Sequence, residues 1–341
     1  MAGFGCQLAV PKLKGAFLYK VAQLIPFGPS RYDWKSLSDL RADVFYIRRP
    51  LFFSRQLVKM LRMLKLKNPM CKILFEVPTY PYDDEFSSIV LRTILAKDIY
   101  NRKRIHAYVD RIVDLSGMKS IFGVPTIQIS NGVDLRKISP RRAGVLAVHG
   151  EVNIIVVASF SRWHGIDRLV TGLCAYYAEK PCRRVILHMV GEGPERKALE
   201  DMAKDYHISD SIHFYGQCGR EAMDAVYDRC SLAVECLGNH RKGITLSSSL
   251  KSREYLAKGM PFVYSGRIDV FEKRGVDFCL QAPDDESPID IESVLVFHDT
   301  LYARESQYSL TSRIRAYAEE NVGMDAAMKP VVDYIKESFE Q

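Results

Sequence analysis

The chain has 341 residues, of which 47% are hydrophobic and 26% are charged, a composition that excludes collagen, a long coiled coil or general disorder. At roughly 100–200 residues per domain, this length predicts two domains, each large enough to bury a core. No apolar run approaches the ~20 residues of a membrane-spanning helix, and the first residues lack the regions of a secretory signal.

The net charge of +7 is unevenly distributed along the chain. Residues 1–135 carry +10, whereas the remaining 206 residues carry −3. A basic half suits an anionic partner such as a phospholipid surface, a lipid-linked phosphate or a nucleic acid. We expect no nucleic-acid partner, because the sequence has no helix-turn-helix, zinc-finger or aromatic RNA-binding signature.

Eight cysteines are scattered through the chain, at positions 6, 71, 174, 182, 218, 230, 236 and 279. None forms a Cys-x-x-Cys pair, which disfavours a zinc ribbon or a thioredoxin-type redox site. Several lie in apolar runs, so we expect buried, reduced thiols in a cytoplasmic protein and no metal site.

In chain order, the first half alternates short β-branched or aromatic runs with segments of helical periodicity. This pattern predicts strands at 43–47, 72–77, 111–115 and 126–129, and helices at 53–67 and 87–109. Strands separated by helices indicate βαβ units and a parallel sheet. The stretch 136–151 has no clear period and is expected to be a linker.

The helix expected at 53–67 combines an apolar stripe with a basic remainder. Leu57, Met60, Leu61 and Leu64 recur at helical spacing, and lysines and arginines fill most other positions. Such a helix lies either in a membrane interface or on the surface of an ordinary α/β domain. The stretch 12–25 has a similar character. The sequence is therefore compatible with two locations, a purely cytoplasmic one and peripheral attachment to the inner face of a membrane.

The second half repeats the alternation. It predicts strands at 153–158, 185–190, 211–215, 231–235 and 262–264, and helices at 167–177, 194–206, 221–228 and 251–258. We therefore expect an N-terminal domain at 1–135, a linker at 136–151, a C-terminal domain at 152–310 and a helical tail at 311–341. Ligands of doubly wound sheets bind at the carboxyl ends of the strands, which indicates the loops 159–166, 191–194, 216–220 and 237–250.

Two of these loops carry residue types that suit a phosphate-bearing ligand. The sequence Val190-Gly-Glu-Gly-Pro194 follows a strand and opens a helix, where glycine lets a ligand approach the backbone; the alternative is a plain tight turn. It lacks the third glycine of a dinucleotide fingerprint, which disfavours NAD. The serines at 247–249 precede a helix, where hydroxyls and free amides suit phosphate or sugar hydroxyls.

Three further segments are ambiguous by themselves. Lys251 and Glu254 lie on one helical face, and the alternative to a ligand role is a surface salt bridge behind a helix cap. The loop Ala158-Ser-Phe-Ser-Arg-Trp-His-Gly165 presents a Trp-His-Gly sequence that is either exposed to a ligand or packed on the core. Ser130-Asn-Gly-Val-Asp134 is a turn signal.

Taken in order, these segments resemble glycosyltransferases of the GT-B fold, family 4 (the group 1 transferases). The resemblance is firmest over residues 110–270, and its last segment, 251–259, is similar to bacterial members from surface-polysaccharide clusters. It implies an α/β fold of two doubly wound Rossmann-like domains facing a cleft. The first βαβ portion of the N-terminal domain is expected to be short or absent.

The resemblance also implies a nucleotide-sugar site in the C-terminal domain. Glu254 matches the family's glutamate that binds the ribose hydroxyls, since a carboxylate can accept two hydrogen bonds from a vicinal diol. Ser247, Ser248 and Ser249 fall where the family's loop meets the donor phosphate or sugar. The positions that cradle the base are Gly191, Glu192, Gly216 and Gln217.

Some positions depart from the family pattern. The family's other glutamate falls on Leu246, and its phosphate-binding Arg and Lys fall on Ser159 and His164. Histidine is a weaker phosphate ligand than lysine at neutral pH, so we expect a missing cation to come from Arg241, Lys242 or Lys251.

In the N-terminal domain, the resemblance places the acceptor near the end of the strand at 72–77. Thr79 and Tyr80 are the candidates for acceptor contact, although a rigid proline-rich turn explains the same segment. We count Glu76 of that strand, together with His164, as a catalytic candidate.

The resemblance thus implies a retaining, hexosyl-type glycosyltransferase (EC 2.4). It would move a sugar from a nucleoside diphosphate to a hydroxyl acceptor, expected to be lipid-linked, in the synthesis of cell-surface polysaccharide or glycolipid. No cofactor is expected, because the leaving phosphate accepts the proton while the protein positions the substrates and supplies positive charge. The alternative hypothesis is a truncated or degenerate GT-B protein that binds nucleotide or a partner. Nucleotide-sugar epimerisation is a third, with no specific support.

Overall fold

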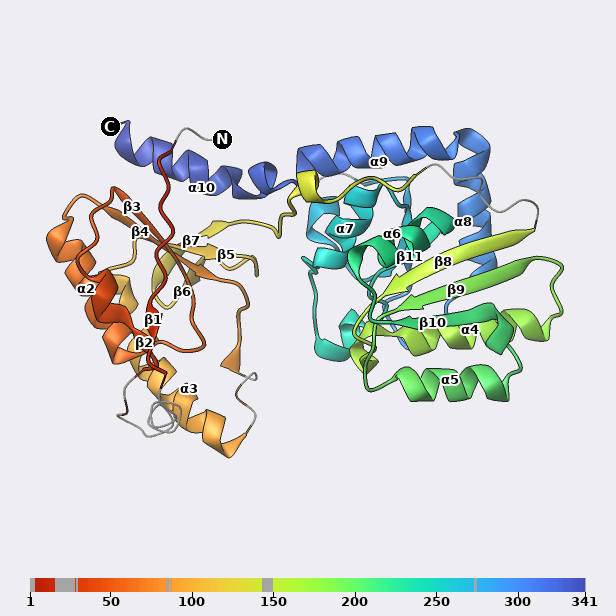
Figure 1. The fold of residues 1–341 in the computed structure, drawn as a ribbon, viewed down its shortest axis with the longest axis horizontal. Coiled ribbons are helices and arrows are strands. Elements are labelled where there is room, and N and C mark those ends of the chain that lie inside the picture. The colour runs from red at the N-terminus through yellow and green to blue at the C-terminus, as the bar shows by residue number, and fades with distance from the viewer. Residues whose placement is uncertain are drawn as a thin grey trace. The chain divides into compact units, whose positions relative to one another are not determined.

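The chain forms two compact units in a computed structural model that describes residues 4–15, 28, 30–83, 86, 88–142, 150–272 and 275–340 (Figure 1). Unit 1 comprises Met1–Ile129 and Met328–Gln341, and unit 2 comprises Ser130–Ala327. These limits differ from the expected domains, because the C-terminal residues divide between the two units. Much of the expected linker, at 143–149, and most of the second basic stretch, at 16–25, lie outside the described residues.

Unit 1 contains a five-stranded sheet in the order β3-β4-β5-β7-β6. Its strands are β3 (Val44–Arg48), β4 (Lys72–Val77), β5 (Arg111–Asp114), β6 (Ser120–Ile121) and β7 (Val124–Gln128). The four longer strands are parallel, as the sequence predicts, and β6 pairs antiparallel with β7. The four parallel strands β3, β4, β5 and β7 follow chain order without a reversal, which is one half of a doubly wound pattern. A separate antiparallel pair joins β1 (Lys12–Leu13) to β2 (Tyr32–Asp33).

The basic segment of unit 1 forms helix α2 (Arg55–Lys67). Ser54 caps it, because its side chain accepts a hydrogen bond from the Leu57 backbone N–H at 3.2 Å. The apolar stripe of α2 is buried in one core with the β4 side chains Ile73 and Phe75. This burial corrects the membrane-interface hypothesis for the stripe, since these side chains already occupy the core of unit 1 and α2 is a surface helix of an α/β fold.

The second helix of unit 1, α3 (Ile89–Arg102), is shorter than the predicted 87–109. The chain instead turns through a 3₁₀ helix at Ile105–Ala107, which returns Ile105 and Val109 to the core. The other face of the sheet is covered by the end of α10 (Met324–Phe339). There Val331 packs on a small cluster formed by one residue from each of β4, β5 and β7, namely Leu74, Val113 and Ile127.

Unit 2 is a doubly wound sheet of six parallel strands in the order β10-β9-β8-β11-β12-β13. The strands are β8 (Glu151–Val157), β9 (Arg184–Val190), β10 (Ile212–Gly216), β11 (Leu232–Val234), β12 (Phe262–Ser265) and β13 (Cys279–Ala282). The winding direction reverses between β8 and β11, and ligands of such folds bind beside that reversal. The predicted fold class is therefore confirmed here. Strand β13 was not among the predicted strands.

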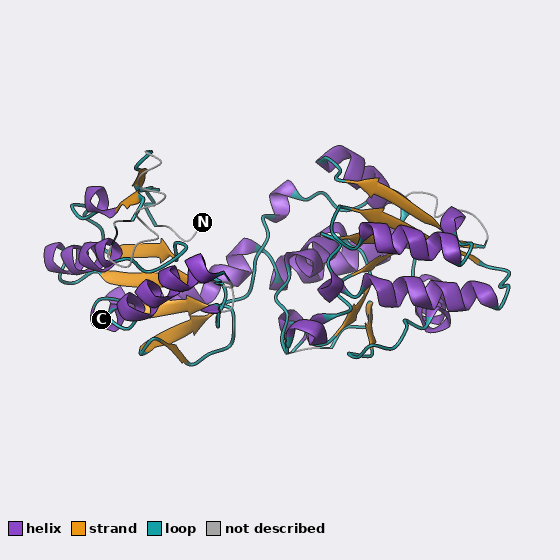
Figure 2. Cartoon of the chain, turned by 90° about the horizontal axis from the view of Figure 1, so that it is seen from below, coloured by secondary structure: helices purple, strands orange, loops and turns teal. Residues whose placement is uncertain are grey.

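Helices cover both faces of the unit 2 sheet (Figures 1 and 2). One face carries α4 (Ile166–Ala178), α5 (Arg196–Asp205) and α8 (Ile291–Arg304), and the other carries α6 (Arg220–Arg229), α7 (Leu250–Lys258) and α9 (Gln307–Asn321). Alternate strand residues point to each core, which gives buried strands their continuous apolar runs. Much of the expected helical tail belongs to the core of unit 2, because Leu310 and Ile314 of α9 pack with Leu256 of α7. None of the described helices is long and apolar enough to cross a membrane.

Candidate functional site

The loops that follow β8, β9, β10 and β11 gather at one edge of the unit 2 sheet, because these strands are parallel neighbours. Backbone hydrogen bonds tie the loops together. The Gly191 N–H donates to the Gly216 carbonyl at 2.7 Å, and the Phe160 N–H donates to the Glu192 carbonyl at 3.0 Å. The four loops that the sequence selects thus form one continuous surface.

Gly191 has a structural explanation within this surface. Its φ of +127° disfavours any residue with a side chain, and a Cβ here would lie 1.9 Å from the Ala158 carbonyl oxygen. The glycine is therefore required for close packing of two loops. This favours the tight-turn interpretation of the Val190–Pro194 segment over direct contact with a ligand.

Ser249 is the N-cap of α7, and its hydroxyl hydrogen is committed to a protein group. It accepts from the Ser252 backbone N–H at 3.2 Å and donates to the carboxylate of Glu235. Glu235 directly follows β11 and is 1% exposed. Its second oxygen accepts from the Cys236 backbone N–H. A buried carboxylate therefore fixes the cap of α7.

Ser248 is held by Asn131, which is 117 residues away in the chain, and by Arg253 of α7. Its hydroxyl oxygen accepts from the Asn131 backbone N–H at 3.0 Å and from Nη2 of Arg253 at 3.1 Å. Its carbonyl accepts from the Asn131 side-chain amide at 2.5 Å. Ser247 is buried, and its backbone pairs with that of Arg267 and Asp269. Its hydroxyl makes no hydrogen bond with another described residue.

Two lysines lie beside the loop that carries Ser247, Ser248 and Ser249, which we call the serine loop. Lys251 lies in the first turn of α7 and makes no ion pair or hydrogen bond with the described residues. The Lys242 ammonium lies 4.2 Å from the centre of the Trp163 ring. Both lower the pKa of His164. Burial lowers this pKa first and most strongly, and the two charges lower it further, to about 3. His164 is thus neutral at pH 7 and adds no positive charge to the site, and its place as a catalytic candidate stays a prediction.

Trp163 adopts the packed arrangement rather than a freely exposed one. Its ring centroid lies 3.8 Å from that of His164, and the Trp163 carbonyl accepts from the Cys236 thiol at 3.2 Å. The loop after β8 is thereby attached to the loop after β11. Ser159, on the same loop, is exposed.

Glu254 is a partly buried carboxylate on α7. The Tyr227 hydroxyl donates to it at 3.3 Å. Burial raises the pKa of Glu254, while the Tyr227 hydrogen bond and the charge of Lys258 act in the opposite direction. The structure records no salt bridge between Glu254 and Lys251 among the residues it describes, so the surface-salt-bridge alternative gains no support.

Arg241 is not available as the missing cation. Its guanidinium donates to both oxygens of Asp167 at 2.7 and 2.8 Å and to Glu286 at 2.9 and 2.5 Å, and its side chain is 9% exposed. The structure therefore corrects this prediction: Arg241 holds the loop after β11 against α4 and the loop before α8. Lys242 and Lys251 remain as candidates.

The base-cradle positions lie together at the loops after β9 and β10. Glu192 and Gln217 are exposed, and Glu192 forms an ion pair with Arg196 of α5. A Cβ on Gly216 would lie 3.0 Å from the Glu192 carboxylate, so the two predicted positions are in direct proximity. The Glu192 carboxylate is engaged by Arg196 rather than free.

The acceptor candidates lie in unit 1. Glu76 is the penultimate residue of β4 and accepts from the Tyr46 hydroxyl at 3.0 Å, with the Arg48 guanidinium at 3.5 Å. Its carboxylate therefore belongs to an ion-paired cluster near the end of the strand, and its catalytic role stays a prediction. Thr79 is exposed, whereas the Tyr80 ring packs edge-on against Phe122 at 5.6 Å, as the rigid-turn alternative predicts.

Comparison with known proteins identifies the class to which this arrangement is similar. Residues 141–265 match the family model of the glycosyl transferases group 1. The match covers the reversal of the unit 2 sheet and all four loops. No curated protein sequence matches the chain.

Solved structures show the fold. Sucrose-phosphate synthase from Thermosynechococcus elongatus is 17% identical, with a TM-score of 0.60 over 90% of this chain and 76% of that one. A glycosyltransferase from Rickettsia africae is 10% identical, with a TM-score of 0.60 over 90% and 80%. HepE of Anabaena, in complex with UDP, is 13% identical, with a TM-score of 0.59 over 89% and 80%. The chain therefore has the GT-B fold.

Two residues that shape the candidate site were not selected from the sequence. Glu235 and Arg253 are 1% and 0% exposed, yet both hold the serine loop. A signal existed for Glu235, because a carboxylate directly after a buried strand seldom lacks a partner. Nothing in the local sequence of Arg253 indicates its partners, of which Asn131 is 122 residues away.

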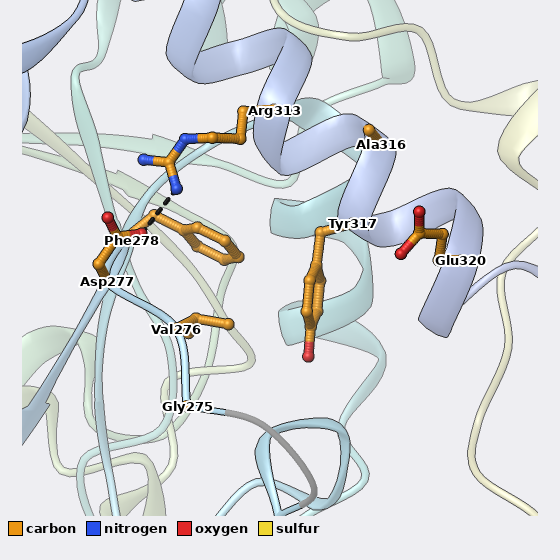
Figure 3. A pocket seen from close by; sticks show the side chains of 8 residues that line it. All are labelled: Gly275, Val276, Asp277, Phe278, Arg313, Ala316, Tyr317 and Glu320. Carbon is orange, nitrogen blue, oxygen red and sulfur yellow. Dashed lines mark hydrogen bonds and ion pairs between the residues drawn. The ribbon is translucent and has the colours of Figure 1, made fainter.

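A pocket of about 440 Å³ lies elsewhere in unit 2 (Figure 3). Residues 275–278, which precede β13, form one wall and α9 forms the other. Arg313 crosses to Asp277 at 2.6 Å, and the rings of Phe278 and Tyr317 meet edge-on at 5.4 Å. The pocket lies where β13 begins, whereas the serine loop follows the carboxyl end of β11. None of the predicted site residues lines this pocket.

Proposed function

We propose that the protein is a glycosyltransferase that uses a nucleoside diphosphate-sugar donor. The observation that carries the proposal is the serine loop of unit 2, with the unpaired Lys251 in the first turn of α7, inside the segment that matches group 1 transferases. Free backbone N–H groups of a first helical turn and a nearby ammonium both favour a phosphate. Glu254, five residues after Ser249, binds the ribose in this proposal.

The donor phosphates would lie against Lys251 and the hydroxyls of the loop. Lys251 then supplies the charge that the sequence lacks at position 164, with Lys242 as the second candidate. A single opposite charge at about 4 Å is worth ~4 kcal/mol at an effective dielectric constant of 20, which is enough to replace one missing cation. HepE of Anabaena has been crystallised with UDP and with UDP-glucose, which supports a uridine donor and a hexose here.

We propose a retaining reaction. The bond from the anomeric carbon to the β-phosphate oxygen breaks, the acceptor oxygen bonds to the same face, and its proton passes to the departing phosphate. The protein contributes positioning and stabilises the developing diphosphate charge. No cofactor is required. Among the described residues no cluster of three or more His, Cys, Asp or Glu could hold a metal ion.

A lipid-linked hydroxyl is the acceptor we propose, in cell-surface polysaccharide or glycolipid synthesis. The support is the charge of +10 in residues 1–135, which suits the phosphate of a lipid carrier or an anionic membrane surface. The alternative is a GT-B protein that binds a nucleotide without transferring a sugar. The absence of a carboxylate at Leu246 favours it.

The test begins with isothermal titration of the full chain with UDP, GDP, ADP and CDP. Glu254→Ala and Lys251→Met are expected to weaken the preferred nucleotide about tenfold or more, since each removes a hydrogen-bonding or charged partner. Glu179→Ala and Lys204→Met are the matched controls, because both residues are exposed near the far ends of α4 and α5. Controls that lose affinity equally would place the nucleotide elsewhere.

Transfer is measured with the sugar conjugate of the preferred nucleotide and a membrane extract as acceptor source. Release of the nucleoside diphosphate together with a glycosylated product that keeps the donor's anomeric configuration supports the enzyme. Nucleotide binding without turnover, in any extract, would favour the non-catalytic alternative.

A further inference from the structure

The solvent-facing side of α2 carries cations that no described residue neutralises. At ~100° of rotation per residue, three cations lie opposite the buried stripe of this helix: Arg55, Lys59 and Arg62. All three are exposed, and none forms an ion pair or hydrogen bond with the described residues. The lysines on the flanks of the helix are neutralised, because Lys65 pairs with Asp110 at 2.6 Å and Lys67 pairs with Asp39.

The same side of α2 also exposes large apolar side chains. Leu66 continues the row of cations one turn further along the helix and is 61% exposed. Met63 lies beside the row and is 36% exposed, and Met70, in the turn between α2 and β4, is 84% exposed. These cations and apolar residues together form what we call the α2 patch: Arg55, Lys59, Arg62, Met63, Leu66 and Met70.

The packing of unit 1 does not account for the α2 patch. Like charges three or four positions apart on a helix repel each other. Arg55 also lies in the first turn, where the helix dipole disfavours a cation and where α2 has no acidic residue. Residues 44–75 contain eight lysines and arginines and no aspartate or glutamate. The charge repulsion and the exposed apolar area both cost stability, and an external partner could relieve both.

We propose that the α2 patch docks on the anionic surface of a phospholipid bilayer, with the helix axis parallel to the membrane plane. The cations would meet lipid phosphates, and the apolar side chains would enter the boundary between headgroups and acyl chains. A bilayer satisfies both parts of the patch, because its anionic headgroups cover an apolar interior. A nucleic acid would pair with the cations and leave Leu66 and the methionines in water.

This surface is distinct from the apolar stripe of α2, which stays in the core of unit 1. The helix therefore docks through its outer side without leaving the unit. The distribution of charge agrees with this orientation, since residues 1–135, which include α2, carry +10 and the other 206 residues carry −3. The inference goes beyond the proposed function and does not depend on it, because docking requires neither a nucleotide nor a sugar.

The charged part of the patch is tested by co-sedimentation of the full chain with vesicles. One set is phosphatidylcholine alone, and the other is an equal mixture of phosphatidylcholine and phosphatidylglycerol. The wild type should bind the mixed vesicles far more strongly than the neutral ones, and more weakly as salt is added. A variant with glutamine at the three cation positions should bind roughly a hundredfold more weakly, since each cation near an anionic surface contributes about fivefold.

The matched control removes three exposed cations that lie outside the patch: Lys119→Gln, Lys180→Gln and Lys204→Gln. It makes the same change in net charge, so it should bind the mixed vesicles much as the wild type does. All substituted positions of the patch and the control are exposed, so unchanged melting temperatures are expected and serve as the check on folding.

The apolar part of the patch is tested separately. Met63→Ser combined with Leu66→Ser should weaken binding to the mixed vesicles about tenfold and leave the salt dependence unchanged. Insertion is measured directly with Leu66→Trp, whose fluorescence should shift to the blue when mixed vesicles are added. Val296→Trp, at a position 64% exposed on α8 of unit 2, is the control and should show no shift.

Three results would overturn the proposal. The first is a wild type that binds the mixed vesicles no better than the neutral ones. The second is a glutamine variant that binds like the wild type, or no more weakly than its matched control. The third is a loss in the glutamine variant with no effect of the serine changes and no blue shift, which would indicate a purely electrostatic partner such as a nucleic acid.

Discussion

The buried His164 gives unit 2 a specific dependence of stability on pH. Burial, followed by the charges of Lys251 and Lys242, lowers the pKa of His164 from 6.5 to about 3. The unfolded chain takes up a proton as the pH falls below 6.5, whereas the folded chain does not until about pH 3. Stability is therefore lost progressively as the pH falls through this window. His164→Asn removes the titrating ring and keeps an acceptor for the Ser161 N–H, which lies 3.3 Å from Nδ1.

The size of the effect follows from the difference between the two pKa values. Between pH 7 and pH 5 the linkage relation gives a loss of ~2 kcal/mol in the free energy of unfolding for this group. That corresponds to roughly a 30-fold change in the unfolding equilibrium. The pKa of His188, which burial lowers to about 4, adds a similar term to wild type and variant alike and cancels in their difference.

The two tryptophans of the chain make the measurement specific to one unit. Trp34 is buried in unit 1, and Trp163 lies beside His164 in unit 2. Urea unfolding is followed by fluorescence in a Trp34→Phe background at pH 7 and pH 5, with and without His164→Asn. His207→Asn, at an exposed position of the same unit, is the control.

The expected result is that the His164→Asn variant loses ~2 kcal/mol less stability than its parent between the two pH values. The control should keep the parental difference, because its ring is exposed in the folded and the unfolded chain. An unchanged difference in the His164→Asn variant would refute the argument, since it would mean that the folded protein protonates this ring as readily as the unfolded chain does.

Three other changes test the packing described above. Leu61→Ala should destabilise unit 1 by about 2–5 kcal/mol, measured by urea unfolding with the unit 1 tryptophan as reporter; an unaltered midpoint would contradict the burial of the α2 stripe. Gly191→Ala should lower the melting temperature of unit 2 by several degrees, because its Cβ meets a carbonyl oxygen at 1.9 Å, and an unshifted melt would speak against the close packing of the loops. Among the thiols, Cys6 and Cys182 are exposed and should react with a disulfide reagent before Cys236, whose pKa burial raises to about 11; mass spectrometry of the labelled peptides tests the order.

The sequence predicts the elements of unit 2 well, because their signals are local. The strands β8 to β12 are short apolar runs, and each is bounded by a helix or a loop with its own cap or glycine. Strand β13 was not predicted, because three of its four residues are only partly buried, the fourth is exposed, and the strand follows no long apolar run. Helix α3 was predicted too long, since periodicity does not reveal where the chain must turn to return Ile105 to the core.

The candidate site also has features that the sequence predicts and features that it does not. The positions of the serine loop, Lys251 and Glu254 follow from their order after a strand and before a helix, so the sequence could select them. It could not decide that Arg241 is consumed by Asp167 and Glu286, which lie 74 and 45 residues away. It also could not decide that His164 is neutral, since the pKa depends on the burial that the folded loops create.

By itself, the sequence determines the alternation of strands and helices, the loops that meet at one sheet edge and the resemblance to group 1 transferases. Only the tertiary structure decides which polar groups are free to meet a ligand. Hydrogen bonds are saturable, and some partners lie far away in the chain, such as Asn131, 117 residues before Ser248, so Ser248 and Ser249 look equivalent in sequence. The contacts with Asn131 and Arg253 leave the hydroxyl hydrogen of Ser248 unused by the described residues, whereas the Ser249 hydroxyl is committed to Glu235 and to the cap of α7.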